Sequence, residues 1–362
     1  MRQKRKTDHL NLARLIEDGP AATGFADIHF IPNCLPDLTL AEVSTVSYFL
    51  GEKFEAPILI NAISGGVPES KELNRALAFA ACRLGIPMAV GSMTAALEDP
   101  SVLQTYTVVR EENPHGFIAA NVSAGINPEL ALNAVELLRA DALQLHLNAP
   151  QEAAMPYGEG DLTFRGFLEN IKAVVKTSPV PVIVKEVGFG MAKEEALNLL
   201  EAGVTVLDTG GSGGTNFIHI ESFRGNSREA YPFYNWGIPS AVTLLEVAEA
   251  VKMYTGKRKT AAEIVASGGI RSGLDTAKAL ALGANLVGVA APLLRAYYQE
   301  GKQGVLNCLH LLQHQLRQAM FMLGVQSPEL LQSRPLVILG ETGKWLELRG
   351  YNLRDLANRK NR

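Results

Sequence analysis

Eight short apolar runs alternate with amphipathic stretches along the chain after residue 55. The predicted strands cover 57–63, 87–92, 116–123, 141–147, 181–187, 205–210, 262–268 and 285–291. Apolar residues recur at helical spacing between them, most clearly over 72–85, 127–139, 192–203 and 273–283. Short apolar runs alternating with helices predict parallel strands buried on both faces. Eight such units favour a closed (β/α)8 TIM barrel over an open doubly wound sheet.

Three segments fall outside this repeat. Residues 1–55 precede the first strand and could cap the bottom of the barrel or reach over its mouth. Residues 210–238 form a glycine- and aromatic-rich loop after the sixth strand, of a length typical of functional loops. The end of the chain, 303–362, predicts a long helix followed by a smaller terminal element. We therefore expect a single domain over 1–362, comprising an N-terminal extension (1–55), the barrel (56–300) and a C-terminal helical element (301–362).

The composition narrows the class of protein. Hydrophobic residues make up 47% of the 362 residues and charged residues 20%, as is typical of a globular protein with a large core. The net charge of −3 without a basic stripe argues against nucleic-acid binding, and no apolar run reaches the roughly 18 residues of a membrane helix. The basic N-terminus lacks a following apolar segment, so we expect no secretory signal and a cytoplasmic protein. Cys34, Cys82 and Cys308 form neither a zinc motif nor a disulfide framework, and we expect them to be buried as small hydrophobic residues.

The most specific local motif is SGGIRSG at 267–273, after the seventh predicted strand and before a helix. Its two glycines would let a phosphate approach the backbone, the start of the helix offers N–H groups, and Arg271 adds charge. The next strand ends in GVAAP, and barrels often build a phosphate site after their seventh and eighth strands. GGSGGTNF at 210–217 would bring Thr215 beside it. The pattern predicts a phosphate-bearing ligand at the C-terminal mouth of the barrel.

A lysine ends the fifth predicted strand. Lys185 has apolar sequence on both sides, so its charge needs a partner. An ion pair with Glu186 is disfavoured because consecutive strand residues face opposite ways. Beside a flavin, the ammonium group would stabilise negative charge on the reduced ring.

Two further segments bring polar side chains to the predicted mouth. HLNAPQE at 146–152 leaves the fourth strand, and a carboxylate there could hold a hard cation such as Mg²⁺ together with water and phosphates. The basic RKTDH at 5–9 could clamp a diphosphate by charge-assisted hydrogen bonds. A solvated basic tail is the alternative that charge alone favours.

These motifs occur together, and in this order, in one enzyme family. RKxxH, INAISGG, HLNAPQE, VKEVGFG, GGSGGTNF, NWGIP, SGGIRSG and GVAAP resemble type 2 isopentenyl-diphosphate isomerase, the FMN-dependent form, over nearly the whole chain. HxNxxQE, KEVGFG and GGTNF are the specific parts, whereas SGGIR is shared with many flavin barrels. The resemblance implies interconversion of isopentenyl and dimethylallyl diphosphate, FMN kept reduced by NADPH or NADH, Mg²⁺ on the diphosphate, and a homotetramer or larger assembly.

The resemblance also implies roles for individual residues. The substrate would be bound by Arg5, Lys6, His9, His146, Asn148 and Gln151. FMN would be held by Ala62, Ile63, Ser64, Ser92, Asn121, Lys185, Thr215, Gly269, Ile270, Arg271, Ala290 and Ala291. Glu152 would carry the Mg²⁺, and Gln151, which is neutral, would relay or position protons rather than act as a strong base.

The chain departs from the family pattern after two strands. Gly210 stands where many relatives carry Ser, and GSMTAAL after the second strand lacks an Arg that some members have there. The nearest alternative is an FMN-dependent 2-hydroxy-acid oxidase, which needs a catalytic His in the loop after the sixth strand. That loop has no His before His219. The apolar stretch at 311–324 could serve equally as an oligomer contact or as core.

Overall fold

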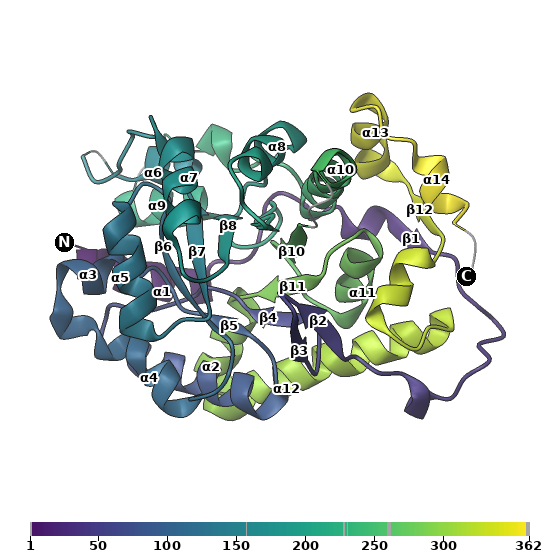
Figure 1. Cartoon of the computed structure of the whole chain (residues 1–362), viewed down its shortest axis with the longest axis horizontal. Coiled ribbons are helices and arrows are strands. Elements are labelled where there is room, and N and C mark those ends of the chain that lie inside the picture. Colours follow the sequence, from purple (N-terminus) through teal and green to yellow (C-terminus); the bar gives the residue numbers. More distant parts are fainter. Residues whose placement is uncertain (1, 157, 227–228, 230, 259–261, 360–362) are drawn as a thin grey trace.

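The strands of the protein close into a barrel. The computed structural model describes residues 2–156, 158–226, 229, 231–258 and 262–359. Eight parallel strands follow the order β10-β11-β4-β5-β6-β7-β8-β9 (Figure 1). They are β4 (Ile58–Ile60), β5 (Met88–Ala89), β6 (Ile118–Ser123), β7 (Ala142–Leu147), β8 (Val182–Glu186), β9 (Val206–Asp208), β10 (Glu263–Ser267) and β11 (Leu286–Val289). Each lies inside one of the eight apolar runs, so the predicted strands and the TIM barrel are confirmed.

Helices cover the outside of the barrel because each buries one apolar stripe against the strands. They are α2 (Ser70–Leu84), α4 (Gln104–Glu112), α5 (Pro128–Leu138), α7 (Phe167–Thr177), α8 (Lys193–Glu201), α10 (Ser240–Arg258), α11 (Gly273–Ala281) and α12 (Ala291–Leu323). The four helices predicted from periodicity correspond to α2, α5, α8 and α11. In the described part of the chain, no helix combines the length and apolarity needed to cross a membrane.

The N-terminal extension covers both ends of the barrel. Helix α1 (Arg2–Leu15) lies at the mouth, where Leu10 is buried. The hairpin of β2 (Ser47–Phe49) and β3 (Glu52–Phe54) closes the opposite end. Its Phe49 and Phe54 pack with Leu59 and with the equivalent residues of the other strands in one apolar cluster. Both placements left open by the sequence therefore occur.

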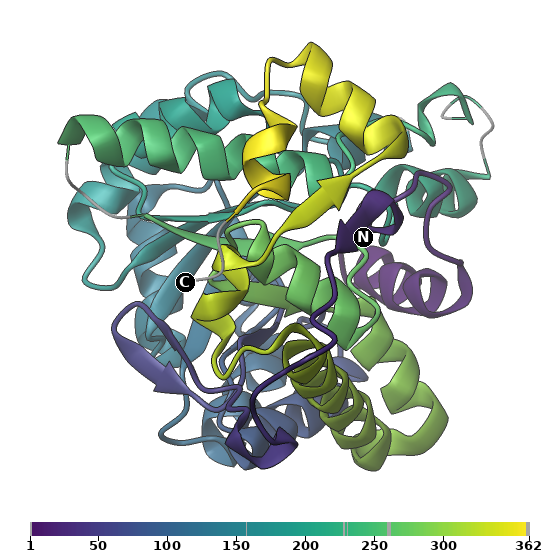
Figure 2. The same cartoon turned by 90° about the vertical axis from the view of Figure 1, so that its right-hand side faces the viewer.

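A small sheet joins the two ends of the chain. Strand β1 (Ile28–Phe30) pairs antiparallel with β12 (Leu336–Ile338). Figure 2 shows this pair as the purple and yellow strands side by side. The elements around β12 are η5 (Pro328–Ser333), α13 (Gly340–Leu348) and α14 (Leu353–Ala357). Helix α12 bends at Glu300 and Gly301, so the boundary expected between barrel and C-terminal element falls inside this helix.

The connection after β9 is more ordered than the sequence suggested. The segment expected to be a loop over 210–238 contains α9 (Phe217–Gly225) and the 3-10 turn η4 (Tyr231–Phe233). Asn216 caps α9 by accepting a hydrogen bond from the backbone N–H of His219, 3.0 Å away. Because glycines precede this cap, the sequence pattern predicted a loop here and not a helix. Short helices α3 (Thr94–Glu98) and α6 (Ala149–Ala154) follow β5 and β7 in the same way.

The prediction for the cysteines is wrong. Cys34 and Cys82 are exposed, and Cys308 is only partly buried. Cys82 lies on α2 away from the buried stripe that contains Leu73 and Leu77. Cysteine type alone did not reveal which side of the helix this residue occupies.

Candidate active site

One cavity of about 490 Å³ opens at the C-terminal ends of the strands. It is lined by every residue that the sequence assigned to the site except one. The exception is Ile270, whose side chain is 1% exposed and packs in the main core. Its neighbours Gly269 and Arg271 do line the cavity. The structure therefore brings together residues from the N-terminal helix and from the ends of all eight strands.

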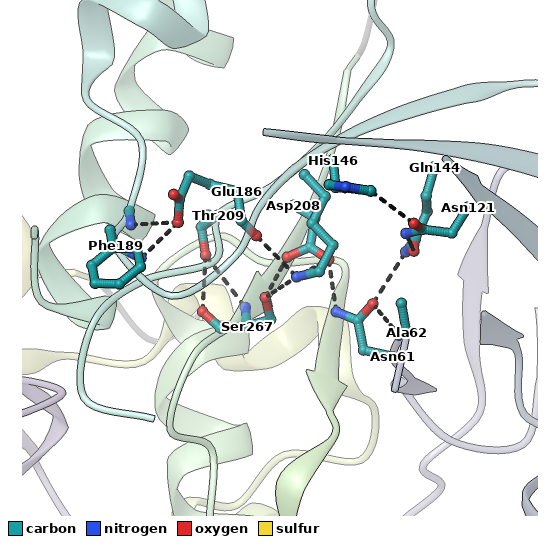
Figure 3. Close-up of polar contacts among 12 residues, drawn as sticks. Asn61, Ala62, Asn121, Gln144, His146, Glu186, Phe189, Asp208, Thr209 and Ser267 are labelled. Atoms are coloured by element: carbon teal, nitrogen blue, oxygen red, sulfur yellow. Dashed lines mark hydrogen bonds and ion pairs between the residues drawn. The ribbon is translucent and has the colours of Figure 1, made fainter. Parts of the chain in front are cut away.

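Buried polar side chains form a continuous chain of hydrogen bonds beside this cavity (Figure 3). Asn61 Nδ2 donates to Asp208 Oδ2 over 2.7 Å, and Gln144 Nε2 donates to Asn61 Oδ1 over 3.2 Å. Asn121 Nδ2 then donates to Gln144 Oε1 over 2.9 Å. Asn121 Oδ1 lies 2.9 Å from Nδ1 of His146. This series of hydrogen bonds links strands on opposite parts of the barrel and leaves these amides with defined partners.

Lys185 meets its counter-ion at one end of this chain. Its Nζ lies 3.2 Å from Asp208 Oδ2 and donates to Ser267 Oγ (3.2 Å) and to the Glu186 carbonyl (3.1 Å). Ser267 Oγ in turn donates to Asp208 Oδ1. Lys185 is 7% exposed and Asp208 is fully buried. The expected partner for the lysine exists, and it is Asp208 rather than the Glu186 side chain.

His146 is a neutral imidazole at the other end. Burial, together with the charges of Lys185 and Lys6, lowers the pKa of His146 to about 4. The Val122 carbonyl acts in the opposite direction and is outweighed. The ring therefore carries no charge near pH 7 in the protein without ligand.

Glu186 points away from this chain and gives a pH-dependent contribution to stability. Burial raises the pKa of Glu186 to about 8, although the N–H groups of Phe189 and Gly190 donate to its carboxylate and lower it. Because this pKa lies above the ordinary value, the related stabilisation is complete below about pH 4.5 and is lost as pH rises through about 8.

We expect the free energy of unfolding to fall between these pH values by less in Glu186→Gln than in wild type, measured by urea denaturation. Equal pH slopes in the two proteins would contradict this account.

Two glycine-rich turns pack against each other on one wall of the cavity. Gly268 has φ +107°, and a Cβ there would lie 2.1 Å from the Gly211 carbonyl oxygen. Gly210 has φ +50°, and a Cβ there would lie 2.0 Å from the Glu186 carbonyl oxygen. Neither position accommodates a side chain in this backbone. The glycine at 210, which departs from the family pattern, is thus required by the local conformation.

The N–H groups at the start of α11 already have partners. The backbone N–H groups of Arg271 and Ser272 donate to Asp275 Oδ2, over 3.2 and 3.1 Å. The N–H of Gly273 donates to Gln315 Oε1 over 2.8 Å. The expectation that this helix start offers N–H groups to a phosphate is therefore wrong for these three. Two of these N–H groups are satisfied by Asp275, which forms a capping box with Ser272, and the third is satisfied by Gln315.

Arg271 is paired with a residue that the sequence analysis missed. Its guanidinium group contacts the carboxylate of Asp18, which also contacts Arg295 at 2.8 Å. Asp18 follows α1, and Arg295 Nη2 donates to the nearby Ile16 carbonyl over 3.1 Å. This cluster anchors the N-terminal extension beside the glycine turns.

Arg5 and Lys6 of α1 lie at the cavity rather than in a solvated tail. Lys6 Nζ donates to the carbonyls of Gly65 and Ser92 and to the hydroxyl of Tyr106, each over 2.7 Å. Arg5 Nη1 lies 3.2 Å from the Met155 sulfur. The structure brings both side chains to the cavity wall.

Glu221 holds two residues of the cavity wall, His9 and Gln151. Its Oε1 lies 2.6 Å from His9 Nε2 and accepts a hydrogen bond from Gln151 Nε2 over 3.2 Å. Its Oε2 accepts from Arg224 Nε over 2.7 Å. Burial alone would raise the pKa of Glu221, but His9 and Arg224 outweigh it and hold the pKa below its usual range. Glu221 was missed because it lies on α9, inside the segment predicted to be a loop; its i,i+3 spacing to Arg224 was the available signal.

Glu152 presents a carboxylate to the cavity. Its Oε1 accepts from Asn148 Nδ2 and its Oε2 from the Asp161 N–H, each over 2.8 Å. No cluster of three or more metal-binding side chains occurs among the described residues. This donor set fits a Mg²⁺ ion held mainly by ligand phosphates and water, and not an all-protein metal cage.

Comparison with known proteins first defines the class. The sequence profile of the family described as FMN-dependent dehydrogenase matches residues 119–337. A lactate oxidase structure from Pediococcus acidilactici has a TM-score of 0.65 at 18% identity, covering 92% of this chain and 87% of that chain. A mandelate oxidase structure has a TM-score of 0.63 at 22% identity, covering 92% and 91%. At such identity these structures show the barrel fold alone, and the class, FMN-dependent dehydrogenase, comes from the sequence profile.

Curated relatives then give the particular family. The chain is 45% identical to "Isopentenyl-diphosphate delta-isomerase" of Symbiobacterium thermophilum, covering 100% of this chain and 99% of the relative. It is 43% identical to the protein of that name from Moorella thermoacetica (96% of both) and 39% identical to that from Methanothermobacter thermautotrophicus (98% and 99%). The chain belongs to the isopentenyl-diphosphate delta-isomerase family.

Proposed function

We propose that this chain interconverts isopentenyl diphosphate and dimethylallyl diphosphate with reduced FMN bound in the barrel mouth. The observation that carries the proposal is the make-up of the cavity. Glycine turns and the buried Lys185 line one part of it, and the basic side chains of α1 with Gln151 line another. A flavin and an anionic substrate would thus occupy adjoining parts of one space. The names of the full-length relatives support this assignment.

The substrate part would use residues from three elements. We propose that Arg5, Lys6 and His9 of α1 act with His146, Asn148 and Gln151 to bind the diphosphate and its carbon chain. Moving the double bond adds a proton at one carbon and removes one from another, with no net oxidation. The developing positive charge on carbon must be kept from water. Gln151, which is 8% exposed and held by Glu221, would position protons at this point.

The cofactor part fits FMN. The cavity wall here has glycines at positions a Cβ would fill, a fixed lysine and an arginine. We propose that Ala62, Ile63, Ser64, Ser92, Asn121, Lys185, Thr215, Gly269, Arg271, Ala290 and Ala291 hold the flavin, with Ile270 contributing through its backbone. When bound, reduced FMN supplies electron density and a proton-carrying ring nitrogen. Lys185 would stabilise negative charge on the ring.

Replacing Gly268 with alanine is expected to weaken FMN binding. The new Cβ meets the Gly211 carbonyl at 2.1 Å on a backbone with φ +107°, so the two turns must shift apart. Such strain costs about 1–3 kcal/mol, or roughly 5- to 140-fold in FMN affinity if expressed on binding. Quenching of flavin fluorescence during titration measures it. Gly256→Ala on α10, where a Cβ meets nothing within 4 Å, is the matched control, and equal affinities of the two variants would contradict the expectation.

The remaining cofactor and assembly proposals follow the family resemblance. We propose that Glu152 carries a Mg²⁺ ion on the diphosphate and that NADPH reduces the flavin. We propose a cytoplasmic homo-oligomer of four or more chains. Leu311 and Met322 of α12 are 55% and 56% exposed and offer apolar surface for contact, whereas Leu312 and Leu316 of the same stretch belong to the core.

The function is tested with purified, FMN-loaded protein. We expect a yellow protein that converts isopentenyl diphosphate only after the flavin has been reduced, with Mg²⁺ present, as followed by proton NMR of the allylic product. Activity with oxidised flavin, or none with reduced flavin, would overturn the proposal.

The 2-hydroxy-acid oxidase alternative lacks its catalytic base. His219, the first histidine after the sixth strand, does not line the cavity and packs against Tyr234 with ring centroids 4.5 Å apart. Bleaching of the oxidised flavin by lactate or glycolate would nevertheless favour the oxidase.

A further inference from the structure

The series of buried amides in Figure 3 has a direction that its carboxylate end, Asp208, imposes. Asp208 is a carboxylate and can only accept, so Asn61 must turn its Nδ2 toward it. The backbone N–H of Ala62 donates to Asn61 Oδ1 over 2.9 Å, which fixes the same orientation from the other side. Asn61 therefore presents its oxygen, and never its nitrogen, to Gln144.

The same constraint passes along the remaining members. Gln144 must donate to Asn61 Oδ1, so its Oε1 faces Asn121. Asn121 must donate to that oxygen, so its own Oδ1 faces His146. An amide oxygen only accepts, so the ring nitrogen facing it must carry a hydrogen. Among the described residues, the one side-chain partner of the His146 ring is this oxygen.

We propose that this directed chain holds His146 as the Nδ1–H tautomer and leaves its Nε2 as a proton acceptor for the cavity. Gln144 and Asp208 are fully buried, and Asn61 and Asn121 are each 2% exposed, so water does not compete for these hydrogen bonds. Asp208 is then a positioning residue that acts on the ligand-binding histidine through three intervening amides. The sequence singled out His146 but gave no information on its tautomer.

The charge state of the ring gives this tautomer a consequence. His146 is neutral without ligand because burial and the ammonium groups of Lys185 on β8 and Lys6 on α1 disfavour a proton. The other charged or titratable side chains lining the cavity are Arg5, His9, Glu152, Glu159, Asp161 and Arg271. A diphosphate in this cavity would offset the lysine charges and supply an acceptor, so Nε2 would take up a proton from solvent when the anion binds. This last step rests on the proposed function; the tautomer does not.

Nitrogen NMR of ¹⁵N-histidine-labelled, FMN-loaded protein at pH 7 tests the tautomer, with His146→Gln to assign the signals. We expect a protonated Nδ1 and an unprotonated Nε2 in the wild type. Gln144→Met keeps the size of the side chain but removes the hydrogen bonds to Asn61 and Asn121. This variant should lose the single-tautomer pattern. Leu145→Met, on the same strand and equally buried in the core, should keep it. A wild-type ring protonated at Nε2 overturns the proposal without any variant, as does an unchanged pattern in Gln144→Met.

Calorimetry with inorganic pyrophosphate and Mg²⁺, in two buffers of different ionisation enthalpy, tests the proton uptake. We expect the wild type to take up about one proton more than His146→Gln. Equal uptake, or no binding of pyrophosphate, overturns this step while the NMR result stands by itself. Failure of the proposed function would instead appear as absent turnover of isopentenyl diphosphate with the NMR pattern intact.

Discussion

Replacing Asp208 with alanine should lower the free energy of unfolding by about 3–5 kcal/mol, because it leaves the Lys185 ammonium buried without its counter-ion. Asp208 is fully buried and accepts from Lys185, Ser267 and Asn61 at once. Their loss strands several polar groups away from water, in addition to the unpaired charge. Urea unfolding of the FMN-free protein followed by circular dichroism measures the change.

Two further variants separate the charge effect from a general sensitivity to mutation. Removing both charges in Lys185→Met/Asp208→Leu should recover much of the loss, because no unpaired ion remains. Glu249→Ala removes a carboxylate from the pair with Lys252, whose side chain is 80% exposed, and should cost about 0–1 kcal/mol. A loss in Asp208→Ala no larger than in Glu249→Ala would contradict the role of Asp208 as buried counter-ion.

The barrel was predictable because its signal is local. Each strand is a short apolar run whose neighbours in the barrel are, for most strands, the next runs along the chain, so periodicity and order suffice. The β1–β12 pair was not predictable in this way. Its register, Ile28 opposite Ile338, joins short segments from the two ends of the chain, and neither segment alternates clearly.

The sequence could predict which strand ends contribute residues to the site, but not which of these residues contact one another. Lys185, Asn121 and His146 could be placed at the mouth because each ends or follows a strand. Asp18 and Asp208 could not be assigned roles, since each acts through partners that come from distant parts of the chain. Glu221 has a local partner in Arg224, but His9, which places it beside the cavity, is distant. Asp275 is different: with Ser272 it forms a capping box three residues apart, which the sequence did contain.

Glu221 explains why the position of Gln151 should matter for catalysis. Gln151 lies on the short helix α6 and is held on one side by Glu221 and contacted on the other by Asn148. Both contacts fix the amide in the cavity. Under the proposed function, a proton is added to one carbon and removed from another there. A neutral amide cannot remove a proton from carbon as a strong base does, so under the proposed function Gln151 would act by placing a proton donor or acceptor.

Replacing Gln151 with alanine is accordingly expected to lower kcat by about 10²-fold or more while FMN remains bound, because positioned proton transfer contributes on the order of 10²–10⁴-fold. Turnover of isopentenyl diphosphate by the reduced enzyme measures kcat, and the flavin absorption spectrum reports retention of FMN. Gln303→Ala, an exposed glutamine on α12, should leave both unchanged. Turnover of Gln151→Ala within about twofold of wild type would remove Gln151 from the catalytic proposal, whereas a parallel loss of flavin would show that the amide instead supports the cofactor site.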